Sequence, residues 1–125
     1  MKGLLGIFAF VLVCNSAHAE TKVDSIQLLN DLSACHARFE MSKHLGITTK
    51  NNSLVNNAQI LMNAVDRAER KIGAIYNIPA TFIDSSNAIA FAKAEAAFRL
   101  SDVTTYFRNS TPIVNHCGVL IKSLL

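Results

Sequence analysis

Residues 24–45 read DSIQLLNDLSACHARFEMSKHL, and this stretch decides how the rest of the chain folds. Its apolar positions recur at intervals of four, three and four residues, which is the spacing of one buried stripe on an α-helix. The stripe consists of Leu28, Leu32, Cys35 and Phe39. We expect a helix over about residues 24–45, with Asp24 and Gln27 as a capping box at its start and Gly46 as its C-cap.

The first residues of the chain have the form of a secretory signal peptide. Lys2 supplies a positive charge, residues 4–13 are apolar, and Ala17-His18-Ala19 matches an A-x-A cleavage site. The apolar run is shorter than the roughly 20 residues that a membrane span needs, so an uncleaved anchor is the weaker alternative. We expect residues 1–19 to be removed and residues 20–125 to be one exported domain without a membrane span, in the bacterial periplasm or extracellular space.

Cysteine spacing predicts the main covalent link of that domain. Removal of the signal peptide takes Cys14 with it and leaves two cysteines, and an even count in an exported chain indicates a disulfide. The end of the chain repeats the helical spacing of the first stripe, now with Ile113, Cys117, Leu120 and Leu124. Each stripe carries one cysteine at a core position. We therefore predict an all-α four-helix bundle whose first and last helices are joined by a Cys35–Cys117 disulfide.

The second helix is predicted from the most regular pattern in the sequence. It should begin after Asn52 or Ser53 as N-cap and run to about Tyr76, ahead of Pro79. Its stripe holds a heptad repeat through Leu54, Ala58, Leu61, Val65, Ala68, Ile72 and Ile75. A coiled-coil partner is one use of such a stripe, but no e/g charge pattern specifies a partner, so packing inside the bundle is preferred.

The third and fourth helices are predicted over about residues 85–108 and from Thr111 to the C-terminus. Asp84 is the expected cap of the third helix, with Ile83 as its hydrophobic staple. Thr111 and Pro112 are the expected N-cap and first residue of the fourth, although a kink in one continuous helix is an alternative. The core stripe of the third helix is expected to be Ile89, Ala96, Leu100, Val103 and Phe107.

Phe91 and Phe98 lie seven residues apart, on a face of the third helix that this stripe leaves free. Exposed aromatic patches mark interaction sites, so these two residues are the candidate partner-binding surface. The alternative is that another part of the chain covers both rings.

The residues that bear chemistry do not form a recognisable catalytic set. Cys35-His36 and His116-Cys117 offer four zinc-ligand types, but adjacent helix positions point about 100° apart and do not easily converge on one ion. His36, Glu40 and His44 share one flank at intervals of four, where simple pairing of Glu40 with a histidine is expected and a metal or proton-sensing site is the alternative. We expect no catalytic residues, no bound metal and no cofactor.

Composition narrows the function classes further. Removing Lys2 from the 12 Lys and Arg residues leaves 11, against 9 Asp and Glu, and this small excess does not indicate a nucleic-acid partner. We therefore expect a non-enzymatic protein-binding module, such as an inhibitor, adaptor or chaperone, which could also form a homodimer. The alternative is a carrier of a small ligand or metal that uses the bundle interior or His36, His44 and His116.

Overall fold

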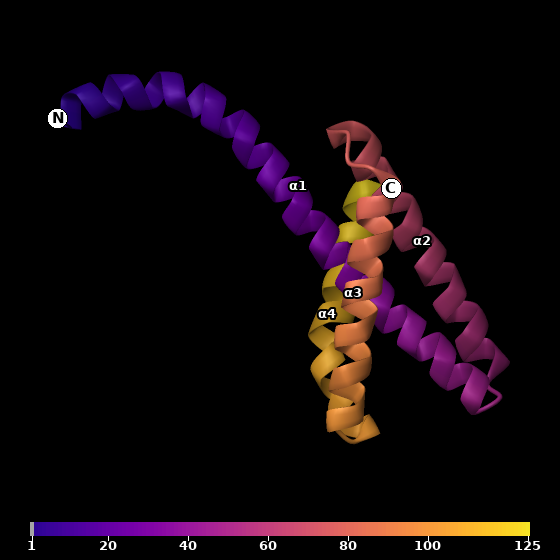
Figure 1. Cartoon of the computed structure of the whole chain (residues 1–125). Helices are drawn as coiled ribbons and strands as arrows, with labels where there is room; N and C mark the ends of the chain where they lie inside the picture. Colours follow the sequence, from indigo (N-terminus) through magenta and orange to yellow (C-terminus); the bar gives the residue numbers. More distant parts are fainter. Residues whose placement is uncertain (1) are drawn as a thin grey trace.

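The protein is a bundle of four α-helices in a computed structural model that describes the backbone of residues 2–125 and the side chains of residues 24–125 (Figure 1). The helices are α1 (Lys2–Thr48), α2 (Asn52–Tyr76), α3 (Ala80–Leu100) and α4 (Val103–Leu124), and these described residues contain no strand. The predicted fold class is confirmed. The expected signal peptide, residues 1–19, lies outside the part of the chain whose side chains are described. Within residues 24–125, no helical segment combines the length and the hydropathy that a membrane span requires.

Helix α1 is the central element, because it contacts each of the other three helices while those three contact one another much less. Helices α1 and α2 form one hairpin and α3 and α4 another, and Figure 1 shows the two turns of these hairpins well apart at the lower end of the bundle. The hairpins are therefore splayed, with α1 passing between its neighbours.

The largest core cluster joins residues from all four helices around the disulfide. Leu32 and Cys35 are fully buried and Phe39 is almost so, which confirms three residues of the stripe predicted for the first helix, while Leu28 is only half-buried. The other buried members of this cluster are Leu29, Val65, Ala68, Ile72, Ile83 and Cys117. Burial of side chains of this size stabilises the fold by about 1.5–3 kcal/mol each, so these residues are the main source of its stability.

The turn between α1 and α2 is shorter than the sequence predicted, because α1 ends later and α2 begins earlier. Gly46 is not a C-cap, because α1 continues to Thr48 and the left-handed residue is Lys50, with φ of 57°. The N-cap of α2 is Asn51, one residue before the predicted pair, and its side chain accepts a hydrogen bond from the Leu54 N–H at 3.1 Å. Gly46 has a different role, since a Cβ atom there would lie 2.8 Å from Val55 Cγ2. The glycine thus lets α1 and α2 approach closely beside their turn.

Replacing Gly46 by Ala is expected to lower the free energy of unfolding by about 1–3 kcal/mol. A methyl group at this position overpacks the contact with α2, and that cost exceeds the roughly 1 kcal/mol that Ala gains over Gly in a helix. Gly118→Ala is the matched control, because nothing lies within 4 Å of the added Cβ there, and it should be neutral or slightly stabilising. Urea unfolding of the three proteins measures the difference, and a Gly46→Ala variant as stable as Gly118→Ala would contradict the close approach.

The break between α3 and α4 lies at Ser101 and Asp102, so the predicted break at Thr111 and Pro112 is wrong. The Asp102 carboxylate accepts hydrogen bonds from the backbone N–H and the hydroxyl of Thr105, at 2.7 and 3.0 Å, and these bonds hold the pKa of its carboxyl below the ordinary value. This side-chain cap fixes the start of α4. Pro112 lies inside α4, where it removes one backbone donor without ending the helix.

The start of α3 also differs from the prediction, because the helix begins at Ala80 after Pro79 as N-cap. Asp84 is inside the helix and is not its cap. Ile83 is not a staple but a core residue, 2% exposed, and its Cδ1 would lie 3.0 Å from a Cβ atom at Gly73 of α2. Asn77, with φ of 57°, ends α2 and lets the chain turn toward this contact.

The face of α3 that packs inward is the opposite of the predicted core stripe. Ile89 and Leu100 are 55% and 88% exposed, so that stripe is wrong for α3. Its last two residues, Val103 and Phe107, belong to α4, where Phe107 is half-buried against the second cluster. The inward face carries Ala94, which joins Ala37, Met41 and Tyr106 in a second buried cluster. Small residues on both helices let α1 and α3 lie close together. A count of large apolar residues therefore favoured the wrong face.

Candidate functional site

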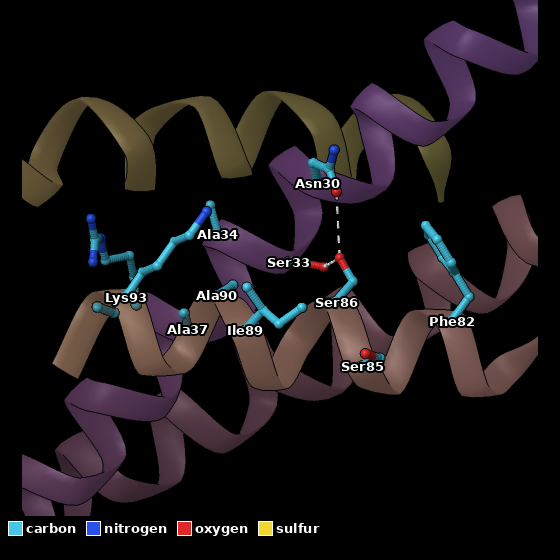
Figure 2. Close-up of a pocket in the computed structure, with 12 residues that line it drawn as sticks. Asn30, Ser33, Ala34, Ala37, Phe82, Ser85, Ser86, Ile89, Ala90 and Lys93 are labelled. Carbon is cyan, nitrogen blue, oxygen red and sulfur yellow. Dashed lines mark hydrogen bonds between the residues drawn. The ribbon is translucent and has the colours of Figure 1, made fainter. Parts of the chain in front are cut away.

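A groove of about 490 Å³ runs between α1 and α3 and is named here the α1–α3 groove (Figure 2). Its lining residues are Asn30, Ser33, Ala34, Ala37, Arg38, Phe82, Ser85, Ser86, Ile89, Ala90, Lys93 and Ala94. Phe82, Ile89 and Lys93 project from α3 along its length. None of the lining residues is acidic.

A polar chain extends from this groove into the interior. Asn30 Oδ1 lies 3.4 Å from Ser86 Oγ, which lies 2.9 Å from Ser33 Oγ, and Figure 2 shows these three side chains meeting between the helices. Ser33 Oγ also lies 3.3 Å from Oε2 of Glu69, a residue of α2 with no exposed surface. Three oxygen–oxygen contacts need three protons, but the two hydroxyls supply only two. Because Ser33 has a single proton, it donates either to Ser86 or to Glu69 Oε2, and its bond to Glu69 lowers the pKa of that carboxyl.

The environment of Glu69 favours the protonated form of its carboxyl. Burial raises the pKa of its carboxyl from 4.5 to about 7, and nearby Asp66 adds to the rise. The hydrogen bond that Asn87 Nδ2 donates to Oε1 at 3.0 Å acts in the opposite direction and lowers the pKa. Arg70 opposes it weakly. Glu69 thus gains and loses its proton near neutral pH. Sequence reasoning missed this residue, although it follows Val65 by four positions and precedes Ile72 by three, which places it on the buried stripe.

Stability is expected to fall as pH rises from about 4.5 to 7, by about 3 kcal/mol at most from Glu69. The raised pKa means that the folded protein holds a proton which the unfolded chain has already released, so this contribution is complete below pH 4.5 and lost above 7. Glu69→Gln should flatten the slope and be more stable than the parent at pH 8. Glu95→Gln, on the surface of α3, is the control that should keep the slope. Urea unfolding at several pH values measures how the free energy of unfolding depends on pH. A Glu69→Gln variant with the same pH dependence as the parent would contradict the raised pKa of Glu69.

A second hollow, of about 320 Å³, lies among α1, α2 and α4 and is named here the α2–α4 cavity. Its lining residues are Arg38, Phe39, Ser42, Leu54, Asn57, Ala58, Leu61, Tyr106, Phe107, Ser110, Thr111 and Val114. Arg38 lines both hollows, and its Nη1 donates a hydrogen bond to the Tyr106 hydroxyl at 3.1 Å. Its guanidinium carbon lies 5.2 Å from the centre of the same ring. The predicted candidates did not include Arg38, and only its placement between two hollows identifies it.

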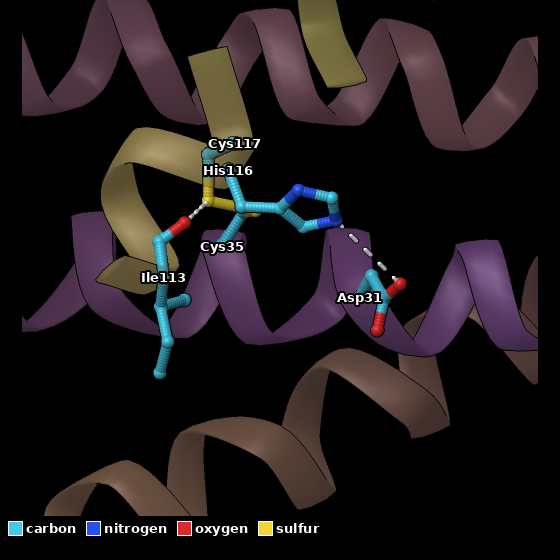
Figure 3. The surroundings of a disulfide bond; sticks show 5 residues. All are labelled: Asp31, Cys35, Ile113, His116 and Cys117. Carbon is cyan, nitrogen blue, oxygen red and sulfur yellow. Dashed lines mark hydrogen bonds and ion pairs between the residues drawn. A yellow bond between two sulfur atoms is a disulfide. The ribbon is translucent and has the colours of Figure 1, made fainter. Parts of the chain in front are cut away.

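The predicted disulfide is present, and it joins α1 to α4 (Figure 3). Cys35 and Cys117 lie 82 residues apart in sequence and 5.7 Å apart between their Cα atoms. The zinc alternative is therefore wrong for these two cysteines. His116 turns away toward Asp31, with 3.9 Å between Nε2 and Oδ2, as Figure 3 shows.

The remaining histidines pair with carboxylates. His36 Nδ1 lies 3.6 Å from Glu40 Oε1, and His36 Nε2 lies 3.9 Å from Asp66 Oδ1. His44 Nε2 lies 4.0 Å from Glu40 Oε2, and its ring lies 5.4 Å from that of Phe91. Within residues 24–125, no group of three or more His, Cys, Asp or Glu side chains has the arrangement of a metal site. The predicted flank is thus a line of weak ion pairs.

Phe91 and Phe98, the predicted binding surface, are half-buried against the second cluster of Ala37, Met41, Ala94 and Tyr106. The Phe98 ring meets Tyr106 edge to face at 5.2 Å across the α3–α4 turn. The chain itself therefore covers part of each ring, as in the alternative that the sequence left open, and part of each ring stays exposed. A partner-binding role for these two residues stays a prediction.

Comparison with known proteins found no match: no protein-family model, no curated protein and no solved structure is significantly similar to the chain.

Proposed function

We propose that the chain is an exported, non-enzymatic protein-binding module that holds a partner in the α1–α3 groove. The observation that carries the proposal is the pair of large apolar side chains on the α3 wall, Phe82 and Ile89, which are 42% and 55% exposed. They lie seven residues apart, which is two helical turns on one face. Two such anchors beside a groove are the usual centre of a protein interface.

The shape and chemistry of the groove suit an amphipathic helix of the partner. Small side chains, Ala34 of α1 and Ala90 of α3, line it and would let a third helix approach closely. Phe82 and Ile89 would then meet apolar residues at helical spacing. Lys93 and Arg38 are the charged residues of the lining, so an acidic residue on the partner helix would complement them.

The compartment in the proposal follows from the cysteines and the N-terminal pattern. Disulfides persist in oxidising compartments such as the bacterial periplasm, and Cys35 is bonded to Cys117. The signal peptide expected over residues 1–19 supports export in the same way.

A site-specific crosslinking experiment tests the groove. A photoreactive phenylalanine analogue placed at position 82 or 89 of the exported protein should form an adduct with a partner when cells are irradiated. The same analogue at Ile60 or Val119 is the matched control, because both positions are 64% exposed and neither lines a hollow. Adducts at the groove positions alone support the proposal. Equal adducts at all four positions, or none at the groove, contradict it.

A paired variant then separates binding from stability. Phe82→Ser with Ile89→Ser should remove an adduct formed from a third groove position, Ser85, while changing stability by no more than about 1 kcal/mol, as expected for exposed sites. Ile60→Ser with Val119→Ser should leave the adduct intact. An adduct whose second component is another copy of this chain would make the groove a homodimer interface.

A further inference from the structure

We propose that the α2–α4 cavity is a binding site for a small amphiphilic carboxylate, a molecule with one acidic head and an apolar tail. This site shares only Arg38 with the lining of the groove assigned to the protein partner, and it does not rest on that assignment. Four observations carry the proposal: the apolar wall of the cavity, the unpaired charge of Arg38, the unbonded hydroxyl of Ser110, and the volume.

The wall opposite Arg38 suits an apolar tail. Leu54, Ala58 and Leu61 of α2 face Phe107 and Val114 of α4 around the cavity. Leu61 and Val114 remain 40% and 38% exposed although they belong to helices that pack in a bundle. Contact with a hydrocarbon tail would remove this surface from water, which is favourable in proportion to the apolar area covered.

Arg38 provides a positive charge that no carboxylate neutralises within residues 24–125. The ion pairs of this part of the chain do not include it, and its one hydrogen-bond partner there is the neutral Tyr106 hydroxyl. Its Nε atom is buried and has no hydrogen-bond partner among the described residues. Only this nitrogen is buried, because Arg38 as a whole is half-exposed, and a carboxylate is the acceptor that best fits a guanidinium. The cavity therefore prefers an anionic head to a neutral or cationic one.

Ser110 adds a second donor of the same kind. Its side chain is 4% exposed, it lines the cavity, and its Oγ has no hydrogen-bond partner among the described residues. Ser110 lies one helical turn after Tyr106, so its hydroxyl and the guanidinium held by the Tyr106 hydroxyl are on the same side of α4. Buried hydroxyls are almost always bonded, and a carboxylate oxygen would satisfy this one.

The volume limits the ligand. A cavity of about 320 Å³ has room for about ten water-sized groups, at roughly 30 Å³ each. A saturated acid of about eight carbons has ten non-hydrogen atoms and fills that space. Longer acids would extend through the open side of the cavity.

Binding of octanoate to the disulfide-bonded protein tests the proposal, with octan-1-ol and octylammonium as neutral and cationic probes of equal length. Titration followed by ¹H–¹⁵N NMR should show saturable shifts of the Arg38 Nε–H signal and of the Ser110 amide with octanoate. Octan-1-ol should bind at least about tenfold more weakly, since it lacks the charge-assisted bonds. Equal affinity for all three probes, or no saturable shift at millimolar octanoate, would overturn the proposal.

Two variants and one control locate the binding. Ser110→Ala removes only an unbonded hydroxyl, so the fold should be retained while octanoate binds several-fold more weakly. Arg38→Gln should weaken octanoate about tenfold or more and leave octan-1-ol unchanged. Lys93→Gln removes a positive charge that lines only the other groove and should bind octanoate like the parent. Parental affinity in Ser110→Ala would contradict the site even if Arg38→Gln failed to fold.

Discussion

Replacing both Cys35 and Cys117 by Ala is expected to lower the free energy of unfolding by about 4–5 kcal/mol, which is the largest single effect we anticipate. The bond closes a loop with a sequence separation of 82 residues, and loop-closure entropy in the unfolded chain rises with loop length. It is also the covalent link between α4 and the central helix, in a bundle where α4 makes fewer contacts with α1 than α2 or α3 does. Without it, α4 depends on packing by half-buried residues such as Ile113 and Leu120.

Urea unfolding of the oxidised parent, the reduced parent and the double Ala variant measures this effect. Reduction should reproduce most of the loss, which distinguishes the bond itself from the small change in side-chain volume. Neither thiol should react with an alkylating agent ahead of reduction, because both residues are buried and bonded. A variant within about 1 kcal/mol of the oxidised parent would show that the disulfide contributes little.

Replacing Phe91 and Phe98 together by Ser is expected to lower the free energy of unfolding by about 4 kcal/mol. Full burial of a Phe side chain makes its truncation cost about 3–5 kcal/mol, and both rings here are half-buried against the second cluster. Phe98 also loses its edge-to-face contact with Tyr106, and Phe91 loses its contact with His44. A partner-binding role for these rings would instead predict little change in stability and a loss of partner capture.

The matched control lies on the same helix. Ile89→Ser with Leu100→Ser removes two residues of the stripe that the sequence predicted as core, but these are 55% and 88% exposed. That pair should cost no more than about 1 kcal/mol, as surface changes usually do. Chemical unfolding of both double variants decides which face of α3 is internal. A larger loss from the control pair would mean that α3 is turned the other way.

Several features were determined by the sequence because they follow from local patterns. Helical spacing of apolar residues around Leu32 and Val65 predicted α1 and α2, and both residues are buried. The two cysteines share that spacing with the core, so the pattern alone predicted the pairing of Cys35 with Cys117, and the bond is present. A period in the sequence is enough where a helix has one dominant apolar stripe, as around Leu32 and Val65.

The helix boundaries near Pro112 needed the structure, because two signals competed there. The cap at Asp102 and the proline ten residues later both mark a possible helix start, and the cap prevailed because its carboxylate bonds both donors of Thr105. That choice places Phe98 and Tyr106 on either side of a turn, where their rings meet. Local sequence does not show which of two helix-start signals is used. That depends on the contacts that the chain makes after it turns back, and these are tertiary.

The orientation of α3 and the two hollows were decided by tertiary structure alone. The inward face of α3 is marked by Ala94 and not by its largest apolar residues, because close approach to Ala37 of α1 requires small side chains on both helices. The unpaired donors of Arg38 and Ser110 arise only where three helices converge. Such features depend on the distances between helices, and these distances are set by residues far apart in the sequence.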